Sequence, residues 1–380
     1  MCTGYRSRIG NNHSCSSTAR ARGAFSHRRS PFLMRPLRRR CRRRVHVRFL
    51  VAGAGFGQQH LEWLGRCAAD VRVLGYHSNR ARAEELAARY GIGTVTTDVV
   101  GAIADGGVDA AVISSPPDTH EELAAAALDS GLAVITDKPL AHDVAAAARL
   151  AGHPSAQRAA VVFQWRINPA LRELRRLLQA GEFGEVHHVE LTFHHDFLAG
   201  PETAFPWRHR REHAGAGALA DQGVHLFDVL RWIAPGDWQV TGARTAVACK
   251  ERRGPTGPVR CETEDVADVW LADAGDRHAR VFVSRIAAGR RCFQVIVQAA
   301  RAVLVVEASP DDGSARLLVS TLGTAGPVVT AFPAHDMNPY PAILDRLSEV
   351  DGQHAGLIAG FDDALVAQQL LHQALAHDER

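Results

Sequence analysis

The sequence predicts an α/β protein with an N-terminal Rossmann domain, a doubly wound parallel sheet, followed by an α+β domain with a large, mostly antiparallel open sheet. Two observations support this prediction. From residue 45 to about residue 150, short apolar runs alternate with alanine-rich helical segments, which is typical of a parallel sheet. Beyond residue 155, long alternating strand segments follow one another without interleaved helices, which favours an antiparallel sheet.

Composition limits the class of protein. The chain has 380 residues, of which 46% are hydrophobic and 22% charged, and this suits two folded domains rather than a disordered chain. Its seven cysteines include no CxxC pair, so we expect neither a disulfide framework nor a structural zinc site. This cysteine usage suits a reducing compartment, and we therefore expect a cytoplasmic location. No apolar run approaches the roughly 20 residues that cross a bilayer, so we expect no membrane partner.

The N-terminal head differs from the rest of the chain. Residues 1–48 hold 14 arginines and no acid, so the remaining 332 residues carry 3 minus 14, a net charge of −11. We expect residues 1–44 to be a disordered extension, with Met34 as an alternative start. An arginine-rich arm that binds nucleic acid is the other interpretation, but the head lacks interleaved aromatic residues, so we expect no nucleic-acid partner.

The first domain, residues 45–155, is predicted from strand and helix segments in order. An apolar run over 45–53 ends in glycines, and Leu61, Leu64 and Ala68 behind it have helical spacing. Further strands are expected over 71–76, 108–115 and 132–137, and helices over 80–91, 121–131 and 142–151. The glycines that close two of these helices are typical C-terminal signals.

The second domain, residues 156–380, begins with a predicted strand over 158–165 and a helix over 169–181. The long alternating segments that follow predict the open sheet. They cover 185–195, 238–250, 264–272, 277–286, 292–299 and 302–308. Leucine and alanine spacing predicts a closing amphipathic helix over 360–379.

A glycine-rich turn joins the first predicted strand to the first helix. Gly53, Gly55, Phe56 and Gly57 lie there in a GxGxG spacing, one residue shorter than the usual dinucleotide fingerprint. Backbone N–H groups and the positive end of the helix meet at such a turn, and together they favour an anionic pyrophosphate. A purely structural turn is the alternative.

The end of the second strand bears on the choice of cofactor. An acid there binds the free ribose 2′-hydroxyl of NAD, whereas this chain has His77, Ser78, Asn79 and Arg80, with Arg82 beyond. A hydroxyl, an amide and two guanidiniums suit a 2′-phosphate, so the sequence favours NADP(H), with NAD(H) as the alternative. The two arginines could equally belong to the solvated face of the next helix.

Further motifs carry a resemblance to a known family. Ser115, Pro116 and Pro117 precede His120; Asp137, Lys138 and Pro139 end the next strand; and AGAGALADQGVHLFDVLRWI covers 214–233. In this combination the chain resembles the Gfo/Idh/MocA oxidoreductases over about residues 46–375.

The resemblance implies hydride transfer between a nicotinamide cofactor and a sugar or cyclitol. It implies catalytic roles for Lys138, Asp221 and His225, and cofactor contacts from Lys138 and from Ser115, Pro116 and His120. Asp137 departs from the glutamate that the family has before its lysine.

The chemistry of these residue types agrees with that implication. Oxidation of an alcohol needs a base for the hydroxyl proton, and histidine, with an ordinary pKa near 6.5, is suited to that task. A lysine beside the same oxygen would stabilise developing negative charge. On a helix, Asp221 and His225 are spaced i, i+4 and share a face, so the carboxylate could orient the imidazole or bind substrate. An ordinary surface or capping pair is the alternative.

Other polar residues are assigned from their position in the chain. Arg166, Trp207 and Arg208 are candidate substrate contacts beside Asp221, although Trp207 could be a core residue and the arginines solvated. The 20 histidines match no metal-ligand spacing, so we expect no metal.

We therefore predict an NAD(P)-dependent dehydrogenase or reductase that acts on CH–OH groups of a carbohydrate-like substrate, as a homodimer or homotetramer. The alternatives are a family member that cleaves or isomerises a glycoside through transient hydride transfer, and a non-catalytic module that senses NADP.

Overall fold

A computed structural model describes residues 47–200, 203, 205, 207–254, 257–347 and 356–378. The arginine-rich head, for which the sequence predicted disorder or a nucleic-acid arm, lies outside these described residues. No helix in the described ranges is both long enough and apolar enough to cross a membrane.

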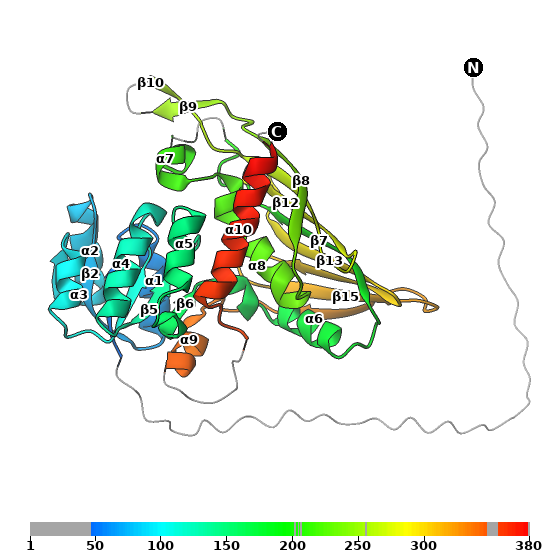
Figure 1. The fold of residues 1–380 in the computed structure, drawn as a ribbon, viewed down its shortest axis with the longest axis horizontal. Helices are drawn as coiled ribbons and strands as arrows, with labels where there is room; N and C mark the ends of the chain where they lie inside the picture. Colours follow the sequence, from blue (N-terminus) through cyan, green and yellow to red (C-terminus); the bar gives the residue numbers. More distant parts are fainter. Residues whose placement is uncertain are drawn as a thin grey trace, which may run out of the picture. The chain divides into compact units, whose positions relative to one another are not determined.

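Six parallel strands form the first sheet, in the order β3-β2-β1-β4-β5-β6 (Figure 1). The order reverses between β1 and β4, and in open parallel sheets ligands bind at the carboxyl ends of the strands at such a point. This sheet confirms the predicted parallel architecture. The strands are β1 Arg48–Ala52, β2 Asp70–Gly75, β3 Thr94–Thr96, β4 Ala110–Ile113, β5 Ala133–Thr136 and β6 Ala159–Val161.

The sixth strand extends the first sheet past the division that we expected near residue 155. β6 pairs in parallel with β5, with Ala159 opposite Val134, although we had assigned its segment to the second domain. It is also shorter than predicted, because a 3₁₀ turn begins at Gln164. An apolar run of this kind predicts a buried strand, but it does not tell which of two sheets the strand joins.

Five helices accompany the first sheet, and three of them begin at a side-chain cap. Asn79, Asp98 and Asp143 each accept a hydrogen bond from the backbone N–H three residues on. β3 and α3 were not predicted, because both are short and their segment has no clear period. The helices are α1 Gly57–Arg66, α2 Arg80–Tyr90, α3 Val99–Ala104, α4 His120–Asp129 and α5 Val144–Ala151.

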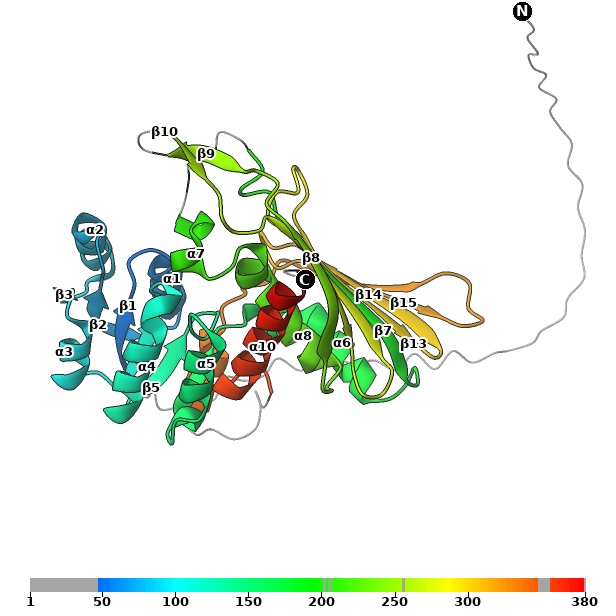
Figure 2. The ribbon, with the colours of Figure 1, turned by 45° about the horizontal axis from the view of Figure 1, so that its top comes forward.

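Eight strands form the second sheet, in the order β16-β15-β14-β13-β7-β12-β11-β8 (Figure 2). All neighbours are antiparallel except β7 and β12, so the predicted open, mostly antiparallel sheet is confirmed. The strands are β7 Val186–His194, β8 Gln239–Ala246, β11 Val266–Ala272, β12 His278–Ser284, β13 Cys292–Ala299, β14 Ala302–Ala308, β15 Ala315–Thr321 and β16 Val328–Phe332. A separate hairpin consists of β9 Glu251–Gly254 and β10 Gly257–Arg260.

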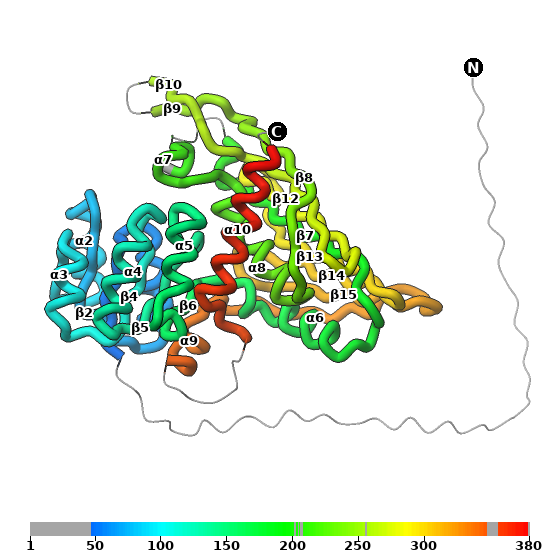
Figure 3. Tube along the Cα trace, viewed as in Figure 1, coloured from blue at the N-terminus to red at the C-terminus, as the bar shows by residue number. Residues whose placement is uncertain are grey.

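Helices α6 (Pro169–Gln179), α8 (Val224–Ile233) and α10 (Phe361–Asp378) cover one face of this sheet (Figure 3). Beneath them Trp165 stacks on Phe293, with ring centroids 3.9 Å apart. Helix α10 also packs against α5, and the Gln368 side chain bonds both backbone groups of Ala141, at 3.1 and 2.7 Å. The two sheets therefore share one core. The remaining helices are α7 Arg211–Ala214 and α9 Tyr340–Leu347.

Candidate active site

The glycine turn after β1 is shaped by close contact with the end of β4. Gly53 has a φ of +124°, and a Cβ at this position would lie 2.6 Å from the Ser114 carbonyl oxygen, so no larger residue fits. A Cβ on Gly57 would lie 3.0 Å from the Ser114 hydroxyl. By contrast, a Cβ on Gly55 would meet nothing within 4 Å. The packing of the protein does not require Gly55, but the close approach of a pyrophosphate would.

A long cleft of about 980 Å³ runs along the carboxyl ends of β1, β2 and β4. Gly53, Gly55 and Phe56 line its centre, Ser115 and Pro116 lie at one end, and the other end is formed by the loop after β2. This shape and the open face of Gly55 suit a dinucleotide. The loop after β2 contributes Tyr76, His77, Ser78, Asn79 and Arg82, and Thr97 and Asp98 face them.

Arg80 does not line this cleft. Its exposed side chain forms an i, i+4 ion pair with Glu84 at 2.7 Å, which matches the solvated-helix interpretation. Arg82 lies in the cleft wall instead, where it bonds Glu85 at 2.6 Å and also Gln58. Asn79 fixes this arrangement, because it caps α2 and thereby orients the first helical turn.

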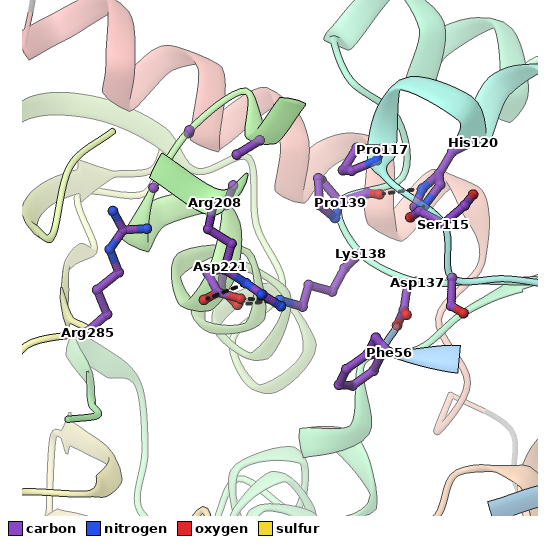
Figure 4. A pocket seen from close by; sticks show the side chains of 15 residues that line it. Phe56, Ser115, Pro117, His120, Asp137, Lys138, Pro139, Arg208, Asp221 and Arg285 are labelled. Atoms are coloured by element: carbon purple, nitrogen blue, oxygen red, sulfur yellow. Dashed lines mark hydrogen bonds and ion pairs between the residues drawn. The ribbon is translucent and has the colours of Figure 1, made fainter. Parts of the chain in front are cut away.

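A smaller inner pocket of about 110 Å³ continues from the cleft. The two cavities share Phe56, Ser114, Ser115 and Arg208 as lining residues. Figure 4 shows Lys138 reaching across this pocket toward Asp221, with Phe56 and Asp137 on one side and Arg208 and Arg285 on the other. Lys138 is the second residue after β5, and the structure brings the predicted lysine and aspartate together although they are 83 positions apart in the sequence.

Positive charge surrounds Asp221. Lys138 Nζ donates to the Asp221 backbone oxygen and lies 3.4 Å from its Oδ1, and Arg208 Nε lies 3.8 Å from its Oδ2. Burial alone would raise the pKa of Asp221, but the charges of Lys138, Arg208 and Arg285 outweigh it and lower the pKa. Asp221 is therefore a carboxylate that holds Lys138 and Arg208 against the pocket wall.

His225 lies behind this ion pair and does not line the inner pocket. It is 3% exposed, its ring meets Phe163 edge-on, and its Nδ1 has no hydrogen-bond partner among the described residues. Burial and the Lys138 charge hold the pKa of His225 well below 6.5, although Asp221 pulls it the other way. The ordinary pKa that the sequence interpretation assumed is therefore too high, and the imidazole is neutral at pH 7.

We had expected Asp221 and His225 to lie on one face of a regular helix, but the structure does not place them so. Residues Leu219–Gly223 form a π-helical segment ahead of α8, and no hydrogen bond joins the two side chains in the described structure. The wider turn and the competing Lys138 direct the carboxylate away from the imidazole. Asp221 consequently acts on His225 through its charge.

Glu264 holds the loop that leads into this segment. Its Oε1 accepts hydrogen bonds from Gly217 N at 2.8 Å and Leu219 N at 3.0 Å. A Cβ on Gly217 would lie 2.0 Å from the Glu264 backbone oxygen, so glycine is required there. The neighbouring Ala216 is buried in the pocket wall, where its methyl group is accommodated.

Arg285 is a pocket residue that sequence reasoning missed. It is 0% exposed and bonds Asp265 at 3.0 Å through Nε and His209 at 2.9 Å through Nη2. Its Nη1 is buried and has no partner in the described structure. One signal could have found it, because residues 281 and 283 are buried and strand alternation places residue 285 on the same face.

His120 lines the inner pocket and joins two of its loops. Its Nε2 lies 2.9 Å from the Ser115 oxygen and its Nδ1 lies 3.1 Å from the Pro139 oxygen, so the ring joins the loops after β4 and β5. Each ring nitrogen therefore faces a backbone oxygen. Of the other predicted contacts, Ser115 lines both cavities, whereas Pro116 lines the cleft alone.

Arg166 lies outside both cavities, contrary to its predicted role as a substrate contact. It is 3% exposed and pairs with Asp228, which is 1% exposed, and with Asp363 at 3.2 Å. Strand β6 leads directly into the 3₁₀ turn that carries it, and this turn directs the guanidinium toward α8. Trp207 belongs to the 3₁₀ turn Trp207–His209, and nothing is described of its side chain.

The many histidines do not gather into a metal site. Within the part of the chain that the structure describes, no three His, Cys, Asp or Glu side chains are arranged to hold a metal ion. His187 is exposed while the next residue, His188, is half-buried, as alternation along β7 requires.

Comparison with known proteins matches the segments that form both sheets to one family. Residues 47–164 match the model of an oxidoreductase family with an NAD-binding Rossmann fold, and residues 171–303 match the GFO/IDH/MocA C-terminal domain. An uncharacterized oxidoreductase of Synechocystis sp. is 31% identical over 63% of this chain and 66% of its own length. Inositol 2-dehydrogenase 1 of Saccharopolyspora erythraea is 33% identical over 49% of this chain and 54% of its own length. The chain thus spans less than two thirds of these curated relatives.

A solved structure agrees with the fold over a larger share of the chain. Levoglucosan dehydrogenase, in complex with NADH and L-sorbose, superposes with a TM-score of 0.76 over 88% of this chain and 96% of its own. The two sequences are 19% identical, so this likeness concerns the fold.

Replacing Arg166 with Ala should destabilise the protein without changing substrate affinity. The substitution leaves Asp228 buried without its counter-charge, which costs about 3–5 kcal/mol of unfolding free energy. Urea denaturation measures this loss, and Arg172→Ala, at an exposed position on α6, is the matched control. An Arg166→Ala protein of unchanged stability with a raised KM would restore the substrate-contact interpretation.

Proposed function

The chain belongs to the Gfo/Idh/MocA family of oxidoreductases with an NAD-binding Rossmann fold, and we propose that it is a dehydrogenase or reductase of a polyhydroxylated, carbohydrate-like substrate. One observation carries the proposal. Lys138 lines the inner pocket, which continues from the dinucleotide cleft, and its ammonium group faces Asp221 there. A substrate oxygen beside this ammonium would lie next to the nicotinamide end of the cleft.

The proposed chemistry divides between the cofactor and three side chains. A bound nicotinamide supplies the hydride acceptor or donor, and the open face of Gly55 leaves room for its pyrophosphate. Lys138 donates a hydrogen bond to the substrate oxygen and stabilises the negative charge that develops there. For His225, held neutral by burial and by Lys138, to accept the hydroxyl proton during oxidation, the substrate must reach past the Lys138–Asp221 pair, behind which the ring lies. Asp221 keeps Lys138 in place and balances its charge.

Unpaired polar atoms beside the pocket support a substrate rich in hydroxyl groups. Arg285 Nη1, His225 Nδ1 and both polar atoms of the Gln222 side chain are buried without partners in the described structure. Groups of this kind are costly to bury unless a ligand or water satisfies them. The similar proteins named above include an inositol and a levoglucosan dehydrogenase, whose substrates also carry several hydroxyl groups.

We propose NADP(H) as the preferred cofactor, with Arg82 rather than Arg80 as the cation near the 2′-phosphate. Arg82 lines the cleft together with the Ser78 hydroxyl and the Asn79 amide. No acid follows β2 directly. Asp98 faces this end of the cleft from the β3–α3 loop, where its carboxylate already caps α3.

Loss of Lys138 or His225 should slow the reaction far more than it weakens cofactor binding. His225→Gln should lower kcat by about 10²- to 10⁴-fold, the usual range for a positioned acid–base group, and Lys138→Ala should act similarly. The measurement is NAD(P)H absorbance at 340 nm with a panel of sugars and cyclitols. Near-normal kcat in His225→Gln would remove this residue from the mechanism, and cofactor binding without turnover of any panel member would contradict the proposed activity.

The pH dependence of oxidation should report His225. The rate rises as the imidazole loses its proton, and because burial lowers its pKa, the midpoint should lie below 6.5. Lys138→Ala removes a nearby positive charge, so the residual activity should have a higher midpoint. His225→Gln should lose this limb of the profile, and a limb that survives the substitution belongs to another group.

Cofactor preference should depend on Arg82. Replacing it with Glu should weaken NADP(H) binding at least tenfold and leave NAD(H) binding nearly unchanged, because the new acid repels the 2′-phosphate. Arg80→Glu is the matched control, since its side chain lies outside the cleft. Titration of cofactor fluorescence measures both, and tighter NAD(H) binding by the unmodified protein would contradict the NADP(H) preference.

We propose a homodimer or homotetramer packed through the second sheet. No helix in the described ranges covers the face opposite α6, α8 and α10, and Trp270 and Val303 on that face are 42% and 39% exposed. Trp270→Glu with Val303→Glu should shift sedimentation toward the monomer. A monomeric unmodified protein at micromolar concentration would contradict this assembly.

A further inference from the structure

A chain of three buried side chains ends in the wall of the inner pocket. The Tyr340 hydroxyl lies 2.7 Å from His60 Nδ1, and His60 Nε2 lies 3.1 Å from Asp137 Oδ2. Tyr340 and His60 are both 0% exposed, whereas Asp137 lines the pocket beside Lys138. The roles proposed above for Lys138, Asp221 and His225 do not use these three residues.

The three hydrogen-bonded side chains come from parts of the sequence that are far apart. His60 lies in the first turn of α1, directly after the glycine turn, and Tyr340 begins α9 beyond the second sheet. Asn338 anchors the Tyr340 segment, because its side chain donates to the Trp63 oxygen at 3.1 Å and accepts from Tyr340 N at 3.0 Å. The segment after the last strand is thereby bonded to the helix that starts at the cofactor cleft.

Aromatic rings fix the orientation of the imidazole. Phe56, Trp63 and Tyr340 meet the His60 ring edge-on, with centroids 5.7, 5.6 and 5.9 Å away. Among the described residues, the two ring nitrogens bond only the hydroxyl and the carboxylate.

Only one arrangement of hydrogens on these three side chains gives every hydrogen between them an acceptor. Asp137, as a carboxylate, only accepts, so His60 Nε2 must carry a hydrogen. A hydrogen on Nδ1 as well would leave the buried Tyr340 hydroxyl hydrogen without an acceptor in the described structure. The neutral Nε2–H imidazole, which accepts from Tyr340 and donates to Asp137, leaves no hydrogen of the three side chains without an acceptor. Burial raises the pKa of Tyr340 well above 10, so the hydroxyl remains a donor.

This series of hydrogen bonds does not carry protons to solvent, because Tyr340 at its far end is fully buried. It instead determines which way the Asp137 carboxylate points. One oxygen of Asp137 bonds His60, so the carboxylate is held at the pocket edge between Phe56 and Lys138 (Figure 4).

We propose that Tyr340 and His60 are positioning residues that orient the Asp137 carboxylate as a hydrogen-bond acceptor for the ligand beside Lys138. This inference rests on the proposed function for the identity of that ligand, a nicotinamide cofactor or its polyhydroxylated substrate. The arrangement of hydrogens in the chain is independent of it.

The first test reads the imidazole directly, without turnover. Nitrogen-15 NMR of histidine-labelled protein, with His60→Gln to assign the resonance, should show the neutral Nε2–H tautomer for His60 at pH 7. Tyr340→Phe keeps the ring but removes the donor to Nδ1, so the His60 Nδ1 resonance should shift while the Nε2–H tautomer, which Asp137 fixes, remains. An Nδ1–H or doubly protonated His60 in the unmodified protein would overturn the inference, whether or not any sugar reacts.

The second test is a double-mutant cycle between Tyr340→Phe and Asp137→Asn. It is measured on the cofactor dissociation constant and on kcat/KM. Tyr340→Phe should cost about tenfold in at least one of these quantities when Asp137 is present, and less than twofold in the Asp137→Asn background. Tyr90→Phe, at a half-buried position on α2, is the control and should change neither quantity.

The outcomes separate the two proposals. Equal costs of Tyr340→Phe in both backgrounds would mean that Tyr340 only packs, and would overturn the positioning role. If no sugar or cyclitol is turned over, the proposed function fails, and the coupling is still read from cofactor binding. If the Tyr340→Phe protein does not fold, the tautomer in the unmodified protein decides the inference.

Discussion

The contact between Lys138 and Asp221 is the interaction on which the site depends. It joins the end of β5 in the first sheet to the π-helical segment ahead of α8 in the second domain. The inner pocket lies at this contact, and its wall comes from both domains. The same ammonium contributes to lowering the pKa of Asp221 and of His225, so the protonation states of the site follow from this contact.

Buried polar groups with few alternative partners hold the pocket wall in place. Arg285 and Asp265 form an ion pair with no exposed surface, an arrangement that is tolerated only when further hydrogen bonds satisfy the groups. His209 accepts one of these bonds from Arg285, and burial with the Arg285 charge lowers its pKa to about 4, so it stays neutral. Glu264 binds two backbone N–H groups of the loop before Asp221. These contacts place Arg285 and Asp221 on the same side of the pocket.

The last part of the chain returns twice to the first domain. Gln368 on α10 bonds both backbone groups of Ala141, shortly after Lys138, and Tyr340 bonds His60 near the glycine turn. Ala141 lies three residues after Lys138, and His60 lies four residues after Phe56, and both Lys138 and Phe56 line the inner pocket. The position of Asp137 and Lys138 therefore depends on residues more than 200 positions away, which explains why the two sheets share one core.

The local sequence pattern was sufficient to predict the order of most helices and strands and the types of residue in the site. Period-two and helical spacing predicted both sheets, because side-chain burial repeats with the backbone, and the glycine turn followed from the contacts that only glycine permits. Short or irregular elements were missed, as were the sheet to which β6 belongs and the π turn that separates Asp221 from His225. Only the tertiary structure decided that Arg166 is a buried structural cation, that Arg82 rather than Arg80 faces the cleft, and that Arg285 reaches the pocket. The physical reason is that partners and burial of a charged side chain come from segments far away in the sequence, and local spacing carries no information about them.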